Sequence, residues 1–159
     1  MPSFAARPLA QAFYTWLVIL KMLNRNDLQR LSNLRLEDAI FLLQANKSSS
    51  AYYLAGYAVE LALKACISRM FQANVIPDKS FVNAIYTHNL EALMNMSGLL
   101  PNLKTRMKED PIFGGYWGVV SKWNEASRYE FWDPVSAATL LQAINCEDHG
   151  VLPWLRTHW

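Results

Sequence analysis

The sequence contains few cysteines, and their spacing excludes two large classes of small protein. Cys66 and Cys146 are the only cysteines among 159 residues, and neither belongs to a CxxC pair or to a Cys/His ligand pattern. Disulfide-rich secreted scaffolds and zinc modules need such patterns. We find no calcium loop and no Ser-His-Asp or Cys-His arrangement either. We therefore expect two reduced thiols, a cytoplasmic protein, and no metal or cofactor.

No hydrophobic run in the sequence is long enough to cross a membrane. The apolar run at residues 12–20 ends at Lys21 and falls short of the ~18 residues that a spanning helix needs. No small-residue cleavage site follows it, as a secretory signal would require. We interpret residues 1–26 as an N-terminal extension or an extra helix. A single domain without a membrane anchor is expected over residues 27–159.

Charge of either sign is also scarce. Charged residues make up 18% of the chain, below the roughly 25% of an ordinary soluble domain, and the formal net charge is only +2. This balance provides no broad basic field for coating nucleic acid, although a local patch can still hold phosphates. Aromatic residues reach 13%, so we expect some apolar surface to be covered in a homodimer.

The sequence favours helices throughout, because no segment shows sustained period-two alternation. Apolar residues recur at helical spacing over residues 27–45, and residues 51–71 form a second helix that is apolar on nearly every side. Start signals then precede three further helices: Asn89 before residues 90–97, Asp110-Pro111 before a helix interrupted at Gly114-Gly115, and Asp133-Pro134 before a helix through Ile144. Trp117, Val120 and Trp123 are expected to be buried. The predicted fold is an all-α, up-and-down bundle of about five to seven helices.

A polar stripe interrupts the apolar second helix. Tyr53, Tyr57, Glu60 and Lys64 are spaced 4, 3 and 4 residues apart, which places them on one face. A charge buried on such a helix needs a partner, and Arg128 is the remote candidate for Glu60. Two interpretations remain open, a structural ion pair and a ligand-facing site.

The sequence resembles the HEPN family of helical proteins in three places. Residues 51–65, AYYLAGYAVELALKA, are similar to the signature second helix of that family. Thr87-His88-Asn89-Leu90 is similar to its His-polar-Leu turn, and the segment from Trp123 to Arg128-Tyr129 is similar to its late Arg-Tyr motif. The three matches follow in the family's order and lie within residues 27–154.

This resemblance implies a helical bundle, commonly dimeric, of the kind found in prokaryotic proteins that bind nucleotides or RNA. Such proteins are often encoded beside a nucleotidyltransferase in toxin–antitoxin pairs. Many are metal-independent endoribonucleases, in which an arginine and a histidine four to six residues later act on one phosphodiester across the dimer. The arginine stabilises the charge of the transition state, and the histidine transfers a proton.

The chain departs from the nuclease pattern after Arg128. The positions four to seven residues further on are Trp132, Asp133, Pro134 and Val135, and neither His88, His149 nor His158 follows an arginine at the required spacing. We therefore expect a non-catalytic binding module, which binds a nucleotide or RNA or a partner nucleotidyltransferase or antitoxin. Its expected ligand residues are Tyr53, Tyr57, Glu60, Lys64, Arg128 and Tyr129.

Two alternatives remain. One is a divergent endoribonuclease toxin that uses His88 and Arg128 in place of the usual pair. The other is a purely structural oligomerisation unit. The basic turn of Lys104, Arg106 and Lys108 is interpreted as solvated surface, because Glu109 and Asp110 follow at once.

Overall fold

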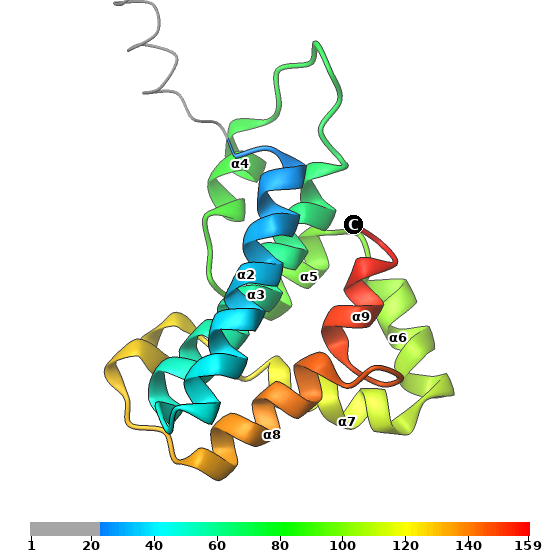
Figure 1. Ribbon diagram of the computed structural model, residues 1–159. Helices are drawn as coiled ribbons and strands as arrows, with labels where there is room; N and C mark the ends of the chain where they lie inside the picture. The colour runs from blue at the N-terminus through cyan, green and yellow to red at the C-terminus, as the bar shows by residue number, and fades with distance from the viewer. Residues whose placement is uncertain (1–22) are drawn as a thin grey trace, which may run out of the picture.

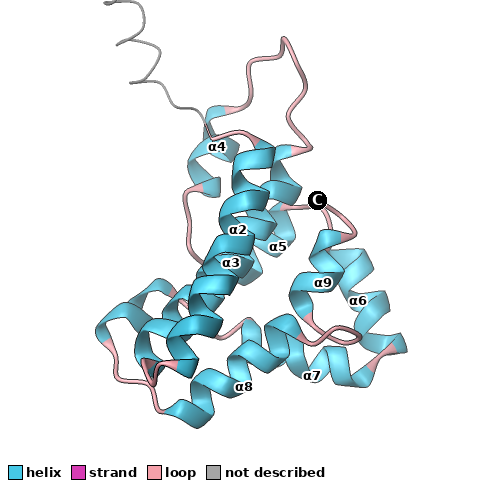
Figure 2. Cartoon of the chain, in the orientation of Figure 1, coloured by secondary structure: helices cyan, strands magenta, loops and turns pink. Residues whose placement is uncertain are grey.

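A computed structural model describes residues 23–159, and all regular structure in this range is helical (Figures 1 and 2). The elements are α2 (Arg25–Gln44), α3 (Ser48–Ser68), α4 (Lys79–Ile85), α5 (Leu90–Met96), α6 (Leu100–Glu109), α7 (Pro111–Val120), the 3₁₀ helix η1 (Glu125–Tyr129), α8 (Pro134–Asn145) and α9 (Val151–Arg156). The predicted all-α bundle is confirmed. The apolar run at residues 12–20, and with it most of the expected N-terminal extension, lies outside the described residues.

The helices differ in number and continuity from the prediction. Residues 23–159 contain eight α-helices instead of five to seven, partly because the segment after the break at residues 75–78 forms α4. The Asp78 side chain starts this helix by accepting a hydrogen bond from the Phe81 N–H at 2.9 Å. The expected interruption of α7 at Gly114-Gly115 is wrong. The helix is continuous because Phe113 and Trp117 are buried on either side of the glycines and hold them in place.

The longest two helices, α2 and α3, lie side by side and antiparallel (Figure 1). Asn24 begins α2 with a capping box, in which its side chain and that of Asp27 each accept a hydrogen bond from the other's backbone N–H. Further along, the buried Ser32 hydroxyl donates to the Ala58 carbonyl at 2.7 Å. This bond fixes the register of α2 on α3.

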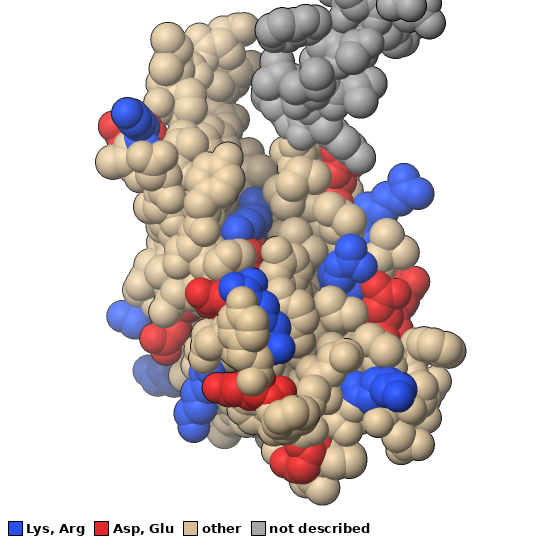
Figure 3. Space-filling view, turned by 90° about the vertical axis from the view of Figure 1, so that its left-hand side faces the viewer, with Lys and Arg blue, Asp and Glu red and all other residues tan. Residues whose placement is uncertain are grey.

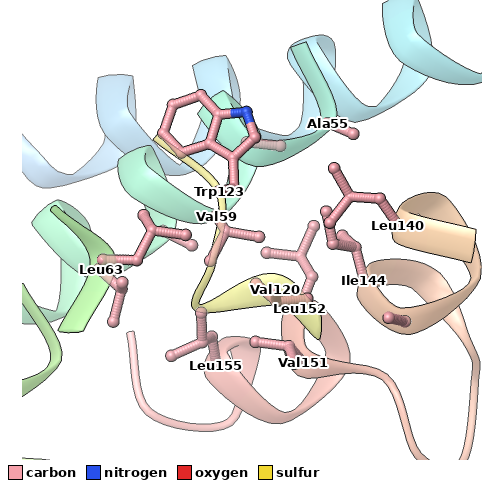
Figure 4. Packing of buried hydrophobic residues seen from close by; sticks show 14 of the residues in the cluster. Ala55, Val59, Leu63, Val120, Trp123, Leu140, Ile144, Val151, Leu152 and Leu155 are labelled. Atoms are coloured by element: carbon pink, nitrogen blue, oxygen red, sulfur yellow. The ribbon is translucent and has the colours of Figure 1, made fainter. Parts of the chain in front are cut away.

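Helix α3 is the centre of the bundle, as its nearly uniform hydrophobicity predicted. Figure 4 shows Ala55, Val59 and Leu63 facing buried side chains of α7, α8 and α9. Trp123 is buried after the end of α7 and packs directly over Gly56, where any side chain would overlap its ring. The buried edge expected from Trp117, Val120 and Trp123 is confirmed.

Charges of both signs are interspersed on the face shown in Figure 3, without a broad field of one sign. This agrees with the small net charge. Among the described helices, none combines the length and the hydrophobicity that a membrane crossing requires.

Candidate functional site

The candidate site is built around a buried carboxylate on α3. Glu60 is only 1% exposed, yet both of its carboxylate oxygens have partners. The Lys64 ammonium donates to Oε1 at 2.8 Å, one helical turn further along α3. On the other side, His88 Nδ1 lies 2.9 Å from Oε2. An ionised carboxylate only accepts hydrogen bonds, so Nδ1 is the donor in this contact, and within residues 23–159 no group is hydrogen-bonded to the other ring nitrogen, Nε2.

His88 reaches α3 from the connection between α4 and α5. The backbone on either side is fixed locally, because the next residue, Asn89, caps α5 by accepting a hydrogen bond from the Ala92 N–H at 2.8 Å. Asn89 also donates its own backbone N–H to the Thr87 hydroxyl. The short polar turn therefore presents the imidazole ring to Glu60.

Aromatic rings line the site above the carboxylate. Tyr53 and Tyr57 occupy successive turns of α3 with ring centroids 5.7 Å apart, and Tyr57 lies 6.3 Å from the His88 ring. Both tyrosines are also within about 6 Å of Trp123, which forms the floor beside Gly56. Burial, and then the Glu60 carboxylate, raise the pKa of Tyr57, so its hydroxyl stays protonated.

The expected Glu60–Arg128 ion pair is wrong. Glu60 is satisfied by Lys64 and His88, whereas Arg128 lies exposed on η1 with its guanidinium 4.8 Å from the Tyr129 ring centroid. Interaction with Tyr129, and to a smaller extent with Tyr53, raises the pKa of Arg128. Arg128 in turn lowers the pKa of Tyr57, against the effect of burial. Arg128 and Tyr129 therefore border the site without neutralising its buried charge.

The structure places four of the six expected ligand residues along one face of α3 and brings Arg128, with Tyr129 beside it, near one end of that face. Tyr53, Tyr57 and Lys64 share one face of α3 with Glu60, and η1 adds Arg128 and Tyr129. Glu60 is enclosed, and both of its carboxylate oxygens are occupied by Lys64 and His88. His88 joins the same cluster through its hydrogen bond to Glu60.

A second cluster of the same chemical type was missed by the sequence analysis. Asp110 ends α6 and caps α7, and its carboxylate accepts hydrogen bonds from the Phe113 N–H at 3.0 Å and from His149 at 2.7 Å. Arg106 forms an ion pair with it at 2.8 Å. The Arg106 guanidinium also donates to the carbonyl of Asp148. The signal available in the sequence was the four-residue spacing of Arg106 and Asp110.

Both cysteines are free in the structure. Burial raises the pKa of the Cys66 thiol to about 11, so Cys66 behaves as a small apolar core residue. Within residues 23–159, no group of three His, Cys, Asp or Glu side chains is arranged to hold a metal ion.

Comparison of the chain with protein-family models, with curated proteins and with solved structures finds no match.

Proposed function

We propose that the protein is a HEPN-like binding module, and that the surface around Tyr53, Tyr57, Lys64, Arg128 and Tyr129 binds a nucleotide or RNA. One observation carries this proposal. Lys64 and His88, from two separate segments, meet at one buried carboxylate, and Arg128 of a third segment lies near the tyrosines on the same face of α3, an arrangement that ordinary core packing does not require.

The chemistry of these side chains suits a phosphate attached to a base. In residues 23–159 no carboxylate lies within ion-pair distance of Arg128, so its guanidinium is available for bidentate hydrogen bonds to a phosphate. Tyr129 is 77% exposed, and because the Arg128 guanidinium lies over one face of its ring, a base can stack on the other face. Glu60 holds Lys64 and His88 in place, which lowers the entropy lost when a ligand orders them.

Two measurements of the binding of mixed short RNAs and of ATP test the proposal, namely filter binding and the shift in melting temperature. Arg128→Ala is expected to weaken binding about tenfold or more, because losing one charged hydrogen-bond pair costs about 1.5–3 kcal/mol. Arg30→Ala is the matched control, since Arg30 is also exposed and belongs to none of the described ion pairs. Equal binding by both variants, or no binding by the native chain, would contradict the proposal.

A divergent endoribonuclease is the second candidate, and one contact favours it. Glu60 contacts His88 at Nδ1, and none of the described residues is hydrogen-bonded to Nε2, which is the arrangement of a carboxylate that holds a catalytic imidazole. Native protein incubated with mixed RNA distinguishes the two functions. Cleavage that both His88→Ala and Arg128→Ala abolish would establish the nuclease. A purely structural unit, the third alternative, predicts that neither ATP nor RNA raises the melting temperature.

The resemblance also suggests protein partners. A homodimer, and a nucleotidyltransferase or antitoxin encoded nearby, belong to this proposal. Co-purification with the product of a neighbouring reading frame tests the second partner. If a nucleotidyltransferase binds the native chain but not the Arg128→Ala variant, the ligand surface and the partner-binding surface are the same.

A further inference from the structure

A pocket of about 340 Å³ lies between α6 and α9, which are neighbours in Figure 1. Its volume is at the lower end of the roughly 300–1,000 Å³ that small-molecule sites occupy, so a small ligand suits it best. Two segments supply the polar and aromatic side chains of its lining: Asn102, Thr105, Arg106 and Glu109 from α6, and Trp154 and His158 from α9 and the residues after it.

The pocket contains a cation that is held in place. Arg106 uses its Nη2 atom for two contacts, a hydrogen bond to the Asp148 carbonyl at 2.9 Å and an ion pair with Asp110 at 2.8 Å. Its guanidinium also lies 5.5 Å from the Phe113 ring centroid. The other terminal nitrogen, Nη1, is reached by solvent and donates to none of the described residues. A guanidinium fixed in this way loses little conformational entropy when Nη1 binds an anionic group.

A carboxylate without a partner lies one helical turn away. Glu109 follows Arg106 by three residues and lines the same pocket, but Arg106 pairs with Asp110 instead. In residues 23–159 no cationic group lies within ion-pair distance of Glu109. Side chains three residues apart on a helix are neighbours, with about 5–6 Å between their Cβ atoms. The pocket therefore presents a fixed donor and an available acceptor of opposite charge within one turn of α6.

These two charges exclude the simplest ligands. Glu109 would repel a simple anion, and Arg106 would repel a simple cation. A ligand that carries both charges on neighbouring groups satisfies both side chains, with its carboxylate on Arg106 and its ammonium group on Glu109. A free α-amino acid has this arrangement. A longer peptide separates its two charged ends by several residues, so it cannot bring both to one helical turn.

The other lining residues suit the rest of an amino acid. Trp154 is half-buried, and its ring is fixed between Phe113, at 5.3 Å between centroids, and His158, at 4.7 Å. An indole held in this way offers an apolar surface for an apolar side chain. Asn102 and Thr105 are exposed and add hydrogen-bonding groups beside the two charges.

We infer that the α6–α9 pocket binds a free α-amino acid with an apolar side chain, whose carboxylate is held by Arg106 and whose ammonium group is held by Glu109. By pairing with Arg106, Asp110 leaves Glu109 available for the ligand. This site is separate from the proposed surface for a nucleotide or RNA, because neither Lys64 nor Arg128 lines it.

Isothermal titration calorimetry of the full chain with L-leucine tests the inference. Leucine is expected to bind. Leucinamide, which lacks the carboxylate, and N-acetyl-leucine, which lacks the ammonium group, are each expected to bind about tenfold or more weakly, because each loses one charged hydrogen bond. Equal affinity for all three compounds, or no binding of either leucine or phenylalanine, would overturn the inference.

Glu109→Gln distinguishes a direct contact from a structural effect. Glu109 is exposed, so the variant is expected to keep its helical circular dichroism. It should weaken leucine binding about tenfold or more without weakening the binding of N-acetyl-leucine, which has no ammonium group to lose. Glu37→Gln is the matched control, because Glu37 is an exposed glutamate on α2 and does not line the pocket.

An equal loss of affinity for both ligands would show that Glu109 does not hold the ammonium group, and would overturn the assignment. Arg128→Ala should bind leucine as the native chain does. Failure of ATP and RNA to bind would refute the proposed function and leave the measurements with leucine decisive.

Discussion

Two clusters in this protein combine the same three kinds of group, a carboxylate, a histidine and a cation, but bury the carboxylate to different extents. In each, one carboxylate contacts the Nδ1 atom of a histidine and a cation four residues away on the chain: Glu60 with His88 and Lys64, and Asp110 with His149 and Arg106. Glu60 is 1% exposed on the central helix, whereas Asp110 is 11% exposed between two peripheral helices. The difference decides what each carboxylate does.

The Asp110 cluster works as a local joint. The same carboxylate caps α7, pairs with Arg106 of α6 and binds His149 in the loop before α9, so it fixes three neighbouring elements. Glu60 caps no helix. It fixes the ends of two side chains beside Tyr57, at a place where the desolvated charge is costly. The Glu60 cluster buries a charge at a cost and does not connect backbone elements as Asp110 does, so it is the stronger candidate for a functional role.

The largest predicted effect is the loss of the buried carboxylate. Glu60→Ala should lower the free energy of unfolding by roughly 3 kcal/mol or more, because Lys64 and His88 lose their only common partner in a buried setting. Urea unfolding followed by circular dichroism measures the change. Asp110→Ala serves as the comparison and should cost less, since Asp110 is 11% exposed against 1% for Glu60, and the Arg106 side chain is 35% exposed against 17% for Lys64. If Asp110→Ala costs more than Glu60→Ala, the contrast between the two clusters is wrong.

The second effect concerns the floor of the candidate site, where Trp123 packs over Gly56. Gly56→Ala should destabilise by about 1–3 kcal/mol, because the new methyl group overlaps the buried indole ring of Trp123 and neither α3 nor the ring has free space. Chemical denaturation gives the magnitude, and the near-ultraviolet circular dichroism of Trp123 reports its displacement. Native-like stability together with an unchanged spectrum would show that the ring can move aside at little cost.

Most of the helices could be predicted because their start signals are local. Asn89, Asp110 and Asp133 each cap a helix as their sequence positions indicate. The first two helices begin two or three residues before the predicted positions, at Arg25 and Ser48. Helix α4 was missed because it has only seven residues, none of them fully buried, and its half-buried Phe81 and Ile85 are too few to give a clear periodic signal.

The candidate site was predicted in composition but not in connectivity. The polar stripe on α3 followed from spacing alone, yet Arg128 was expected to neutralise Glu60. The true partner, His88, is 28 residues further along the chain, and only the folded path of the α4–α5 connection brings it to α3. The sequence indicates that a buried charge needs a partner, but it does not identify which remote residue is that partner.

The loss of stability at acidic pH provides a third test of the comparison between the Glu60 and Asp110 clusters. The hydrogen bond from His149, and then that from the Phe113 N–H, lower the pKa of Asp110 below its usual value. The ionised form is thus favoured by folding, so its stabilising effect is complete above the ordinary pKa of about 3.9 and is lost as the pH falls through the lowered value. Asp110→Asn keeps an N-cap but removes the charge.

We therefore expect urea midpoints of the native protein to fall more steeply with pH below about 4 than those of Asp110→Asn. The hydrogen bonds of Asp78 and Asp133 lower the pKa of each in the same way, so the variant should retain a reduced slope and not a flat profile. Identical slopes for the native protein and the variant would show that His149 and Arg106 do not favour the ionised carboxylate.

The smallest effect is predicted for Gly115 in the peripheral helix α7. A substitution there should change the free energy of unfolding in the opposite direction to one at Gly56. A Cβ atom added at Gly115 of α7 meets no other atom within 4 Å, so the site has room for a side chain. Gly115→Ala should stabilise the protein by about 0.5–1 kcal/mol, because alanine loses less backbone entropy than glycine in a helix. The same urea titrations measure it, with Gly56→Ala as the opposite case. If Gly115→Ala is destabilising, the periphery around Asp110 is packed as tightly as the centre around Glu60, and exposure alone does not separate the two clusters.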